Sequence, residues 1–247
     1  MRVVSLVPSL TETLIACGVE VVGRTRYCVH PTEVVKNITV VGGTKRVDWE
    51  KLTKLSPDLV VMDKEENTRE MADTCPLPWH ATHITSIQSA GKELMELAEH
   101  LPSTDLEELA SGWQALAATP DKPFGGWADF PGVESLVGNS LVEFNRLEYL
   151  IWRDPWMSIG PSTFIGSVLK KIGLSQYMNC HTTSYPELTN NLPEEGTFYM
   201  FSSEPYPFAR HLDELAAKGF NGALVDGEFF SWFGIRSYRM LKNYLRS

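Results

Sequence analysis

Short apolar runs alternate with stretches of helical periodicity through the first hundred residues. The runs are rich in Val, Ile and Leu and are bounded by Gly, Pro, Ser or Asp, which is typical of buried strands. Strands are expected at residues 3–7, 21–23, 38–41, 59–62 and 78–83. Helices are expected at residues 12–17, 49–55, 67–74 and 86–101, with Asp48 and Ser86 as two amino-terminal caps. This alternation predicts parallel βαβ units.

The same pattern restarts in the second half, after a helical middle. Residues 105–118 have apolar positions at helical spacing, and residues 119–132 concentrate proline and glycine, which favours irregular structure. Strands are then expected at residues 147–152, 198–201 and 222–225, and helices at 163–173, 209–218 and 237–245. The sequence therefore predicts an α/β fold of two Rossmann-like lobes with parallel-rich sheets. The expected segments are an N-terminal α/β lobe (1–101), a linking helix with a Gly/Pro-rich connection (102–146) and a C-terminal α/β lobe (147–247).

Three apolar runs of the second half each end in a loop that mixes aromatic rings with charges, at residues 151–156, 203–208 and 226–233. Ligands of open α/β sheets bind at such strand ends, and large rings there suit a flat, partly apolar ligand in a cleft between lobes. The candidate ligand-binding residues are Tyr27, Trp152, Trp156, Tyr206, Trp232 and Phe233. Phe229 and Phe230 are assigned to the core instead. Arg153 could pair locally with Asp154 or reach a ligand carboxylate as a forked donor, and the local role is favoured.

The amino-acid composition limits which binding partners and which cellular locations are expected. The balance of 22 Lys+Arg against 31 Asp+Glu gives a net charge of -9, which argues against a nucleic acid or an anionic membrane as partner. No apolar stretch approaches the ~20 residues that span a bilayer. Four cysteines without a CxxC pair indicate isolated thiols, with one disulfide left open for an oxidising compartment. The chain is cytoplasmic if complete as written, and periplasmic or on the cell surface if a leader was removed.

Metal and enzyme chemistry are the alternatives to simple ligand binding. His30, His80, His83 and His181 with Asp226 or Glu228 offer donors of the kind that zinc or manganese prefers. His80 and His83 stand three apart in an expected strand, so their side chains point to opposite faces, and we assign no metal ligands. None of the common catalytic motifs occurs. We therefore assign no catalytic residues, and a cytosolic hydrolase that uses Asp226 and Glu228 stays as the alternative of another class.

Several segments appear in order and at the spacing of a known family. Residues 4–12, 26–31, 41–45 and 55–60 read VSLVPSLTE, RYCVHP, VGGTK and LSPDLV. With the second-half loops at 152–156, 203–208 and 226–228, they resemble the helical-backbone metal receptor superfamily, the class III periplasmic substrate-binding proteins. The likeness is greatest to the branch that binds vitamin B12 for cobalamin ABC importers, and it covers roughly residues 1–101 and 147–247.

The resemblance implies a non-enzymatic substrate-binding protein without a cofactor of its own. Its ligand would be a corrinoid such as cobalamin, or a related tetrapyrrole or metal chelate, with a metal ion or a ferric siderophore as the alternative. Its partner would be an ABC permease, if the chain is exported. The family docks on the permease through one surface carboxylate per lobe, and the matching positions are Glu66 or Glu70 in the first lobe and Glu204 in the second. Residues 105–118 would be the backbone helix that joins the lobes, although the Gly/Pro-rich stretch after it departs from the family pattern.

Overall fold

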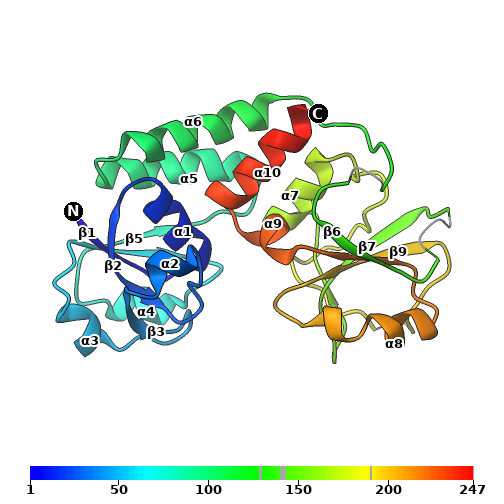
Figure 1. The fold of residues 1–247 in the computed structure, drawn as a ribbon, viewed down its shortest axis with the longest axis horizontal. Coiled ribbons are helices and arrows are strands. Elements are labelled where there is room, and N and C mark those ends of the chain that lie inside the picture. Colours follow the sequence, from blue (N-terminus) through cyan, green and yellow to red (C-terminus); the bar gives the residue numbers. More distant parts are fainter. Residues whose placement is uncertain (128–129, 140–142, 190, 247) are drawn as a thin grey trace. The chain divides into compact units, whose positions relative to one another are not determined.

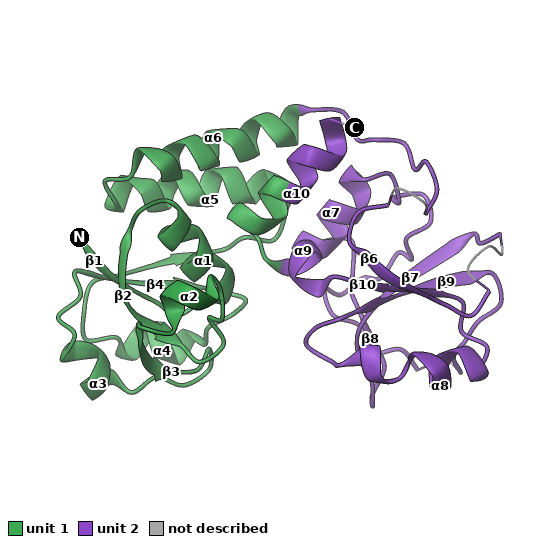
Figure 2. Ribbon diagram, viewed as in Figure 1, with its two compact units in different colours: residues 1–118, 232–239 green, residues 119–231, 240–247 purple. Residues whose placement is uncertain are grey.

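The chain folds into two compact units, and each unit is built from two separate segments of the sequence. The computed structural model describes residues 1–127, 130–139, 143–189 and 191–246. Unit 1 consists of Met1–Ala118 and Trp232–Arg239, and unit 2 consists of Thr119–Ser231 and Met240–Ser247 (Figure 2). The expected N-terminal lobe lies wholly in unit 1, and unit 1 also holds the helical middle and a late segment of the chain.

Unit 1 is built on a parallel sheet whose strand order is β3-β2-β1-β4-β5 (Figure 1). Its strands are β1 (Arg2–Ser5), β2 (Glu20–Thr25), β3 (Thr39–Gly42), β4 (Leu59–Asp63) and β5 (Trp79–Thr82). All neighbouring pairs of this sheet run parallel, so the carboxyl ends of the strands share one edge. All five predicted strands of the first half are confirmed. Val4, Leu6, Val41 and Val60 are buried with Leu52, Met62 and Met71 in one core cluster on this sheet.

Three helices of unit 1 begin at a residue whose side chain caps the helix, namely Asp48, Thr68 and Ser86. They are α1 (Pro8–Ala16), α2 (Thr32–Val35), α3 (Trp49–Thr53), α4 (Arg69–Thr74), α5 (Ile87–His100) and α6 (Thr104–Ala118). The predicted caps are confirmed, since Asp48 accepts a hydrogen bond from Lys51 N and Ser86 accepts one from Ser89 N. Helices α5 and α6 lie side by side (Figure 1). A Cβ at Gly91 would lie 2.9 Å from Gln114 N, so glycine permits this close approach.

Unit 2 is built on a mixed sheet whose strand order is β6-β10-β9-β7-β8. Its strands are β6 (Val133–Val137), β7 (Arg146–Trp152), β8 (Met157–Ser158), β9 (Thr197–Ser202) and β10 (Gly222–Val225). The three predicted strands, β7, β9 and β10, pair in parallel. The sequence did not predict β6 and β8, which pair antiparallel at the two ends of the strand order. Both are short, and three consecutive positions of β6 are exposed, so neither shows a buried apolar run.

The helices of unit 2 and the final helix follow the predicted positions with two differences. They are α7 (Phe164–Lys171), the 3₁₀ turn η1 (Phe208–Arg210), α8 (Leu212–Ala217), α9 (Gly227–Ser231) and α10 (Ile235–Arg246), of which the last contributes to both units. The helix expected at 209–218 is divided, because His211 has a non-helical φ of -122° between η1 and α8. Helix α9 was expected as a loop, and its Phe229 and Phe230 are buried, as predicted.

An aromatic cluster holds the Gly/Pro-rich segment against unit 2. Trp127 stacks on Phe198 of β9 with ring centroids 4.0 Å apart, and Phe124 and Phe130 pack edge-on around it. Lys122 Nζ donates to Tyr244 O at 2.8 Å. The described residues between 119 and 132 form no helix or strand, as predicted, and residues 128–129 and 140–142 of the expected connection lie outside the described part. Ring packing therefore fixes this irregular segment.

Candidate functional site

The loop after β2 stands at the carboxyl edge of the unit 1 sheet and is anchored from inside by Cys28. Its buried thiol accepts a hydrogen bond from Thr11 Oγ1 at 3.0 Å and lies 3.1 Å from Thr25 Oγ1. Burial raises the pKa of this thiol above its ordinary value. Tyr27 N also donates to Thr25 Oγ1 at 3.2 Å. The loop thus has a fixed interior, and it carries Tyr27 outward with its side chain 54% exposed.

Two further candidate ligand-binding residues, Trp232 and Phe233, belong to unit 1. Trp232 opens the late segment of unit 1 and meets His30 edge-to-face with ring centroids 5.5 Å apart. The Arg236 guanidinium lies 5.3 Å from the Trp232 ring, which a cation–π contact stabilises. The structure therefore groups Trp232 with the loop after β2, and not with the strand-end loops of unit 2. Phe233, its neighbour and also a candidate, is only 6% exposed and is a core residue of unit 1.

The strand-end loops of unit 2 bring together only part of the predicted aromatic set. Trp152, at the end of β7, is 40% exposed and meets Tyr206 edge-to-face with ring centroids 5.5 Å apart. The Tyr206 hydroxyl lies 3.4 Å from His211 Nε2. Trp156 instead stacks on the buried Phe208 with an interplanar angle of 5°. Trp152 is thus the exposed ring of this edge, whereas Tyr206 and Trp156 are both partly buried and pack against the core.

Arg153 has a different main partner from the one expected. Its two terminal nitrogens donate to the two carboxylate oxygens of Glu214 at 3.0 and 2.6 Å, whereas Asp154 lies 3.9 Å away. The guanidinium also lies 5.6 Å from the Trp156 ring. The expected ion pair with Asp154 is present at long distance, but the fork of two parallel bonds to Glu214, which was not predicted, is the stronger interaction. Arg153 is held on α8, so it is not presented to a ligand.

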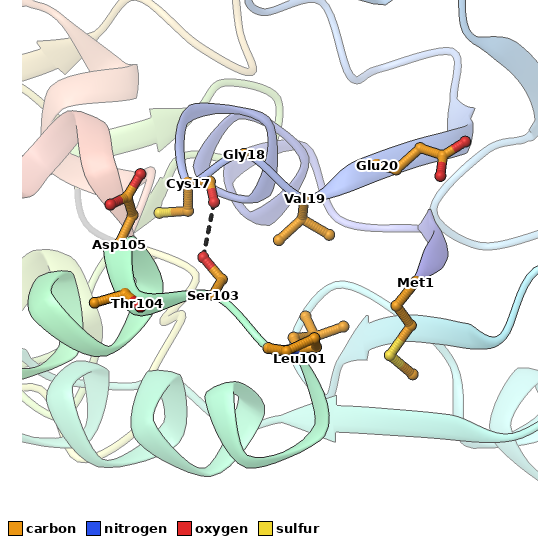
Figure 3. Close-up of a pocket in the computed structure, with 10 residues that line it drawn as sticks. Met1, Cys17, Gly18, Val19, Glu20, Leu101, Ser103, Thr104 and Asp105 are labelled. Carbon is orange, nitrogen blue, oxygen red and sulfur yellow. Dashed lines mark hydrogen bonds between the residues drawn. The ribbon is translucent and has the colours of Figure 1, made fainter.

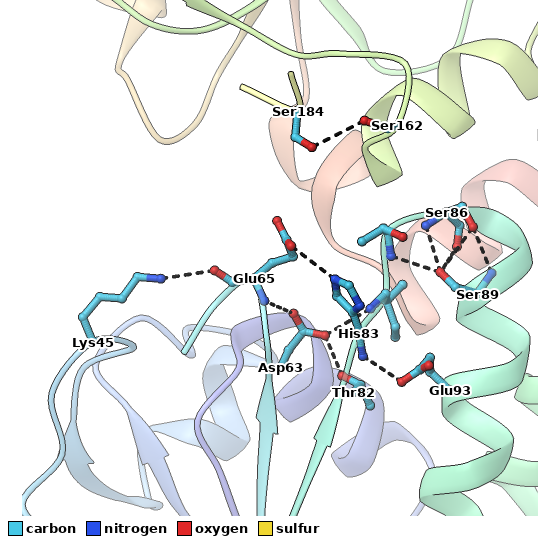
Figure 4. A network of polar contacts seen from close by, with 12 residues as sticks. Lys45, Asp63, Glu65, Thr82, His83, Ser86, Ser89, Glu93, Ser162 and Ser184 are labelled. Carbon is cyan, nitrogen blue, oxygen red and sulfur yellow. Dashed lines mark hydrogen bonds and ion pairs between the residues drawn. The ribbon is translucent and has the colours of Figure 1, made fainter. Parts of the chain in front are cut away.

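A polar network joins the loops that follow β4 and β5 (Figure 4). The buried Asp63 carboxylate accepts hydrogen bonds from Thr82 Oγ1 at 2.6 Å, Glu65 N at 2.9 Å and Ile84 N at 3.3 Å. Burial raises the pKa of Asp63 and the hydrogen bond from Thr82 opposes that rise. His83 Nε2 lies 3.4 Å from Glu65 Oε1. Asp63 therefore fixes the turn that carries the acidic residues after β4.

The three expected docking carboxylates stand on two different loops and one helix. Glu66 follows β4 and is partly buried, and burial raises its pKa, with the charge of Lys45 opposing. Glu70 is exposed in the first turn of α4, and Glu204 is exposed directly after β9. Glu70 and Glu204 are therefore exposed, and the role of each of the three stays a proposal.

Each unit has pockets that the candidate ligand-binding residues do not line. One of about 440 Å³ is lined by Met62, Asn67, Trp79 and Ala81 between α4 and β5. A second, of about 340 Å³, lies beside Cys17, Leu101 and Asp105, where Ser103 Oγ donates to Cys17 O at 2.7 Å (Figure 3). A third, of about 320 Å³, lies in unit 2 beside Glu148 and His181. The sequence-predicted ligand residues line none of these three.

The placement of the described side chains gives little support for a metal-binding site. Within the part of the chain that the structure describes, no three His, Cys, Asp or Glu side chains gather closely enough to hold a metal ion. His181 Nε2 lies 3.0 Å from the buried carboxylate of Glu148, and His80 packs against His100 with ring centroids 4.9 Å apart. These imidazoles have protein neighbours of their own. No described helix has the length and apolar composition that a membrane span needs.

Sequence reasoning assigned no role to three residues that shape the carboxyl edge of the unit 1 sheet. Arg26, Gly43 and Asp63 all lie at strand ends, and RYCVHP and VGGTK were noted as motifs without roles for these residues. The signal was present, because a paired glycine directly after an apolar run marks a close backbone approach.

Residues 3–74 match the family model described as "Periplasmic binding protein". The periplasmic vitamin B12 binding protein BtuF of Vibrio cholerae is 14% identical, with a TM-score of 0.66 over 99% of this chain and 95% of that one. The periplasmic heme-binding protein RhuT of Roseiflexus sp. RS-1 is 17% identical, with a TM-score of 0.65 over 98% and 95%. IsdE of S. aureus, complexed with heme, is 14% identical, with a TM-score of 0.68 over 98% and 97%. The predicted resemblance is confirmed: residues 3–74 carry the signature of the periplasmic binding protein family, and the chain as a whole has the α/β fold of periplasmic substrate-binding proteins.

Proposed function

We propose that this protein is the substrate-binding component of an ABC importer and binds a corrinoid or a related flat tetrapyrrole. The observation that carries the proposal is the presence of accessible aromatic rings at the carboxyl edge of both sheets. Tyr27 and Trp232 stand at this edge of unit 1, and Trp152 and Tyr206 stand at this edge of unit 2. Flat ring ligands bury large apolar faces, and aromatic side chains supply matching faces at low entropic cost.

The comparisons support the same class of ligand. The names of the similar structures refer to vitamin B12 and to heme, which are both flat metal-centred macrocycles. We place the ligand against the strand-end loops that carry these rings, with a periplasmic or cell-surface location. Glu66 or Glu70 on unit 1 and Glu204 on unit 2 would then meet basic residues of the permease.

A binding titration tests the proposal directly. Purified protein is titrated with cyanocobalamin, haem, ferric siderophores and zinc while tryptophan fluorescence and ligand absorbance are followed. Trp152→Ala is expected to weaken binding of the preferred macrocycle by about tenfold or more, because one buried ring contact contributes about 1 to 3 kcal/mol. Trp79→Ala is the matched control, since Trp79 is 45% exposed and lies on β5 beside a different cavity. Tight zinc uptake without a response to any macrocycle would overturn the proposal.

Docking has its own test. Glu204→Lys and Glu70→Lys are expected to lower ligand-dependent ATP hydrolysis by the reconstituted permease while ligand affinity is unchanged. Glu99→Lys reverses an exposed charge at the end of α5 and serves as the control. Equal losses in all three variants would argue against specific docking carboxylates.

A further inference from the structure

We propose that Arg26, Tyr27 and Arg46 form an anion-binding corner of the ligand site on unit 1. The corner would take a negatively charged oxygen group, a phosphate or a carboxylate, at the rim of a flat ligand whose face lies near Tyr27. The inference rests on the proposed function, because it requires the ligand to reach this edge of the unit 1 sheet. It adds a charge requirement that the aromatic residues alone do not impose.

Backbone hydrogen bonds tie the two loops that carry the arginines to the end of β3. Arg26 N donates to Gly42 O at 2.9 Å, and Gly43 N donates to Arg46 O at 2.8 Å. Gly42 has a φ of +150°, and a Cβ there would lie 2.4 Å from Arg46 O. Only glycine allows the chain to fold back so closely. Gly42 at the end of β3 and Gly43 directly after it therefore bring the Arg46 backbone back toward the end of β3, where the loop after β2 is also bound.

The Arg26 side chain is packed beside Tyr27. Its guanidinium carbon lies 5.6 Å from the Tyr27 ring centroid. A Cβ added at Gly43 would lie 3.3 Å from Tyr27 Cε2 and 3.4 Å from Arg26 Nη2, so both groups pack directly over this glycine. A guanidinium held in this way loses less side-chain entropy when it binds a ligand.

The charges of the two arginines are not balanced by neighbours. The protein has 31 Asp+Glu against 22 Lys+Arg, and other arginines such as Arg2 and Arg146 pair with a carboxylate. Arg26 and Arg46 are exposed, and neither forms an ion pair with a described residue. Acidic partners are abundant in this chain. Two exposed arginines on neighbouring loops without a described carboxylate partner, one of them packed beside an exposed ring, therefore indicate an external anion.

The chemistry of the two candidate ligands makes the proposal testable. Haem carries carboxylates at its rim, and cobalamin carries a phosphodiester in its nucleotide loop. Both present anionic oxygens that the planar fork of an arginine binds through two parallel hydrogen bonds. Haem dimethyl ester and dicyanocobinamide retain the macrocycle but lack these anions. The haem pair therefore isolates the charge from the ring, and the corrinoid pair removes the phosphodiester together with its ribose and base.

The experiment measures the dissociation constants of the full chain and of Arg26→Gln and Arg46→Gln for both ligand pairs. Arg239→Gln makes the same change at an exposed arginine of unit 1 on α10. We expect each corner variant to weaken binding of the anionic ligand by about tenfold or more, and binding of its neutral counterpart by less than about threefold. The Arg239→Gln protein should bind all ligands like the parent.

The possible failures are distinguishable. If the parent protein binds a macrocycle but the corner variants lose no affinity, or lose it equally for charged and neutral ligands, the anion-binding corner is overturned and the proposed function stands. If the parent binds no macrocycle at all, the proposed function fails and the inference fails with it. Circular dichroism of each variant shows whether the fold is retained, and Arg26→Lys, which keeps the charge without the fork, should recover only part of the affinity.

Discussion

Arg236 forms a two-pronged ion pair with Glu12, in which Nε donates to Oε2 at 2.9 Å and Nη2 donates to Oε1 at 2.8 Å. The two side chains are only 24% and 17% exposed. The pair joins α10 to α1, two helices that are more than two hundred positions apart in sequence. This ion pair helps to hold the late segment, Trp232–Arg239, against the rest of unit 1.

Removal of this pair should destabilise unit 1. Arg236→Gln is expected to lower the free energy of unfolding by about 2 kcal/mol, because charge-assisted hydrogen bonds contribute about 1.5 to 3 kcal/mol and the Glu12 carboxylate loses its partner. Urea denaturation measures the change. The double variant with Glu12→Gln should cost less than the sum of the two single variants. Additive effects would show that the two side chains do not interact.

The turn before α10 leaves no room for a side chain. Gly234 has a φ of +113°, and a Cβ there would lie 2.1 Å from Thr13 Oγ1, which also accepts a hydrogen bond from Ile235 N at 3.0 Å. Gly234→Ala is expected to cost about 2 kcal/mol or more, from backbone strain and the collision together. Thermal unfolding is the measurement. Gly125→Ala, where a Cβ would meet nothing within 4 Å, is the control and should change stability little.

The Arg153–Glu214 pair predicts a defined dependence of stability on pH. Hydrogen bonds from Arg153, and then from Lys218, hold the pKa of Glu214 well below its ordinary value of 4.5. A lowered carboxyl pKa stabilises the folded state above the unfolded pKa, and this stability is lost as the pH falls through the folded pKa. The parent should therefore be more stable than Glu214→Gln at pH 7, with a difference that shrinks below roughly pH 4.5. A difference that grows in acid would contradict the assignment.

The four free cysteines should differ widely in reactivity. Cys180 is exposed, whereas Cys17 and Cys28 are buried and Cys75 is partly buried. Burial, with Asp105 adding to it, raises the pKa of Cys17 to about 11. At pH 8 only about one molecule in a thousand then carries the reactive Cys17 thiolate. A disulfide reagent should modify one thiol rapidly, and Cys180→Ser should remove this phase. Rapid modification that persists in Cys180→Ser would show that another cysteine is accessible.

Local pattern was enough for elements with buried apolar runs and side-chain caps. β4, with every residue buried, and α5, with its capping box at Ser86, were predicted in type and position. Pattern was insufficient where a contact comes from a distant part of the chain. Arg153 was paired with its sequence neighbour because Glu214 is brought near only by the packing of α8. Trp232 was grouped with the preceding loop of unit 2. The chain passes from unit 2 to unit 1 after Ser231, and no change in amino-acid composition indicates this boundary.

The candidate site shows the same division. Exposed rings at strand ends could be named from sequence, since strand-end loops collect ligand-binding residues. Which rings stay accessible depends on packing, and this separated Trp152 from Trp156 and Phe233. The packing of Arg26 against Tyr27 depends on the turn at Gly42 and Gly43, whose shape the sequence indicates only through the glycines.

The return of residues 232–239 to unit 1 sets an order of events during protein synthesis. The ribosome completes the first 118 residues long before it reaches Trp232, and it makes almost all of unit 2 in between. Until then the indole of Trp113 lacks the Gly234 carbonyl, and Glu12 lacks its arginine. The nascent first unit therefore lacks part of its core packing during the time in which most of the second unit is synthesised. A chain that ends shortly before Trp232 would hold a first unit without its segment Trp232–Arg239 and a second unit without Met240–Ser247.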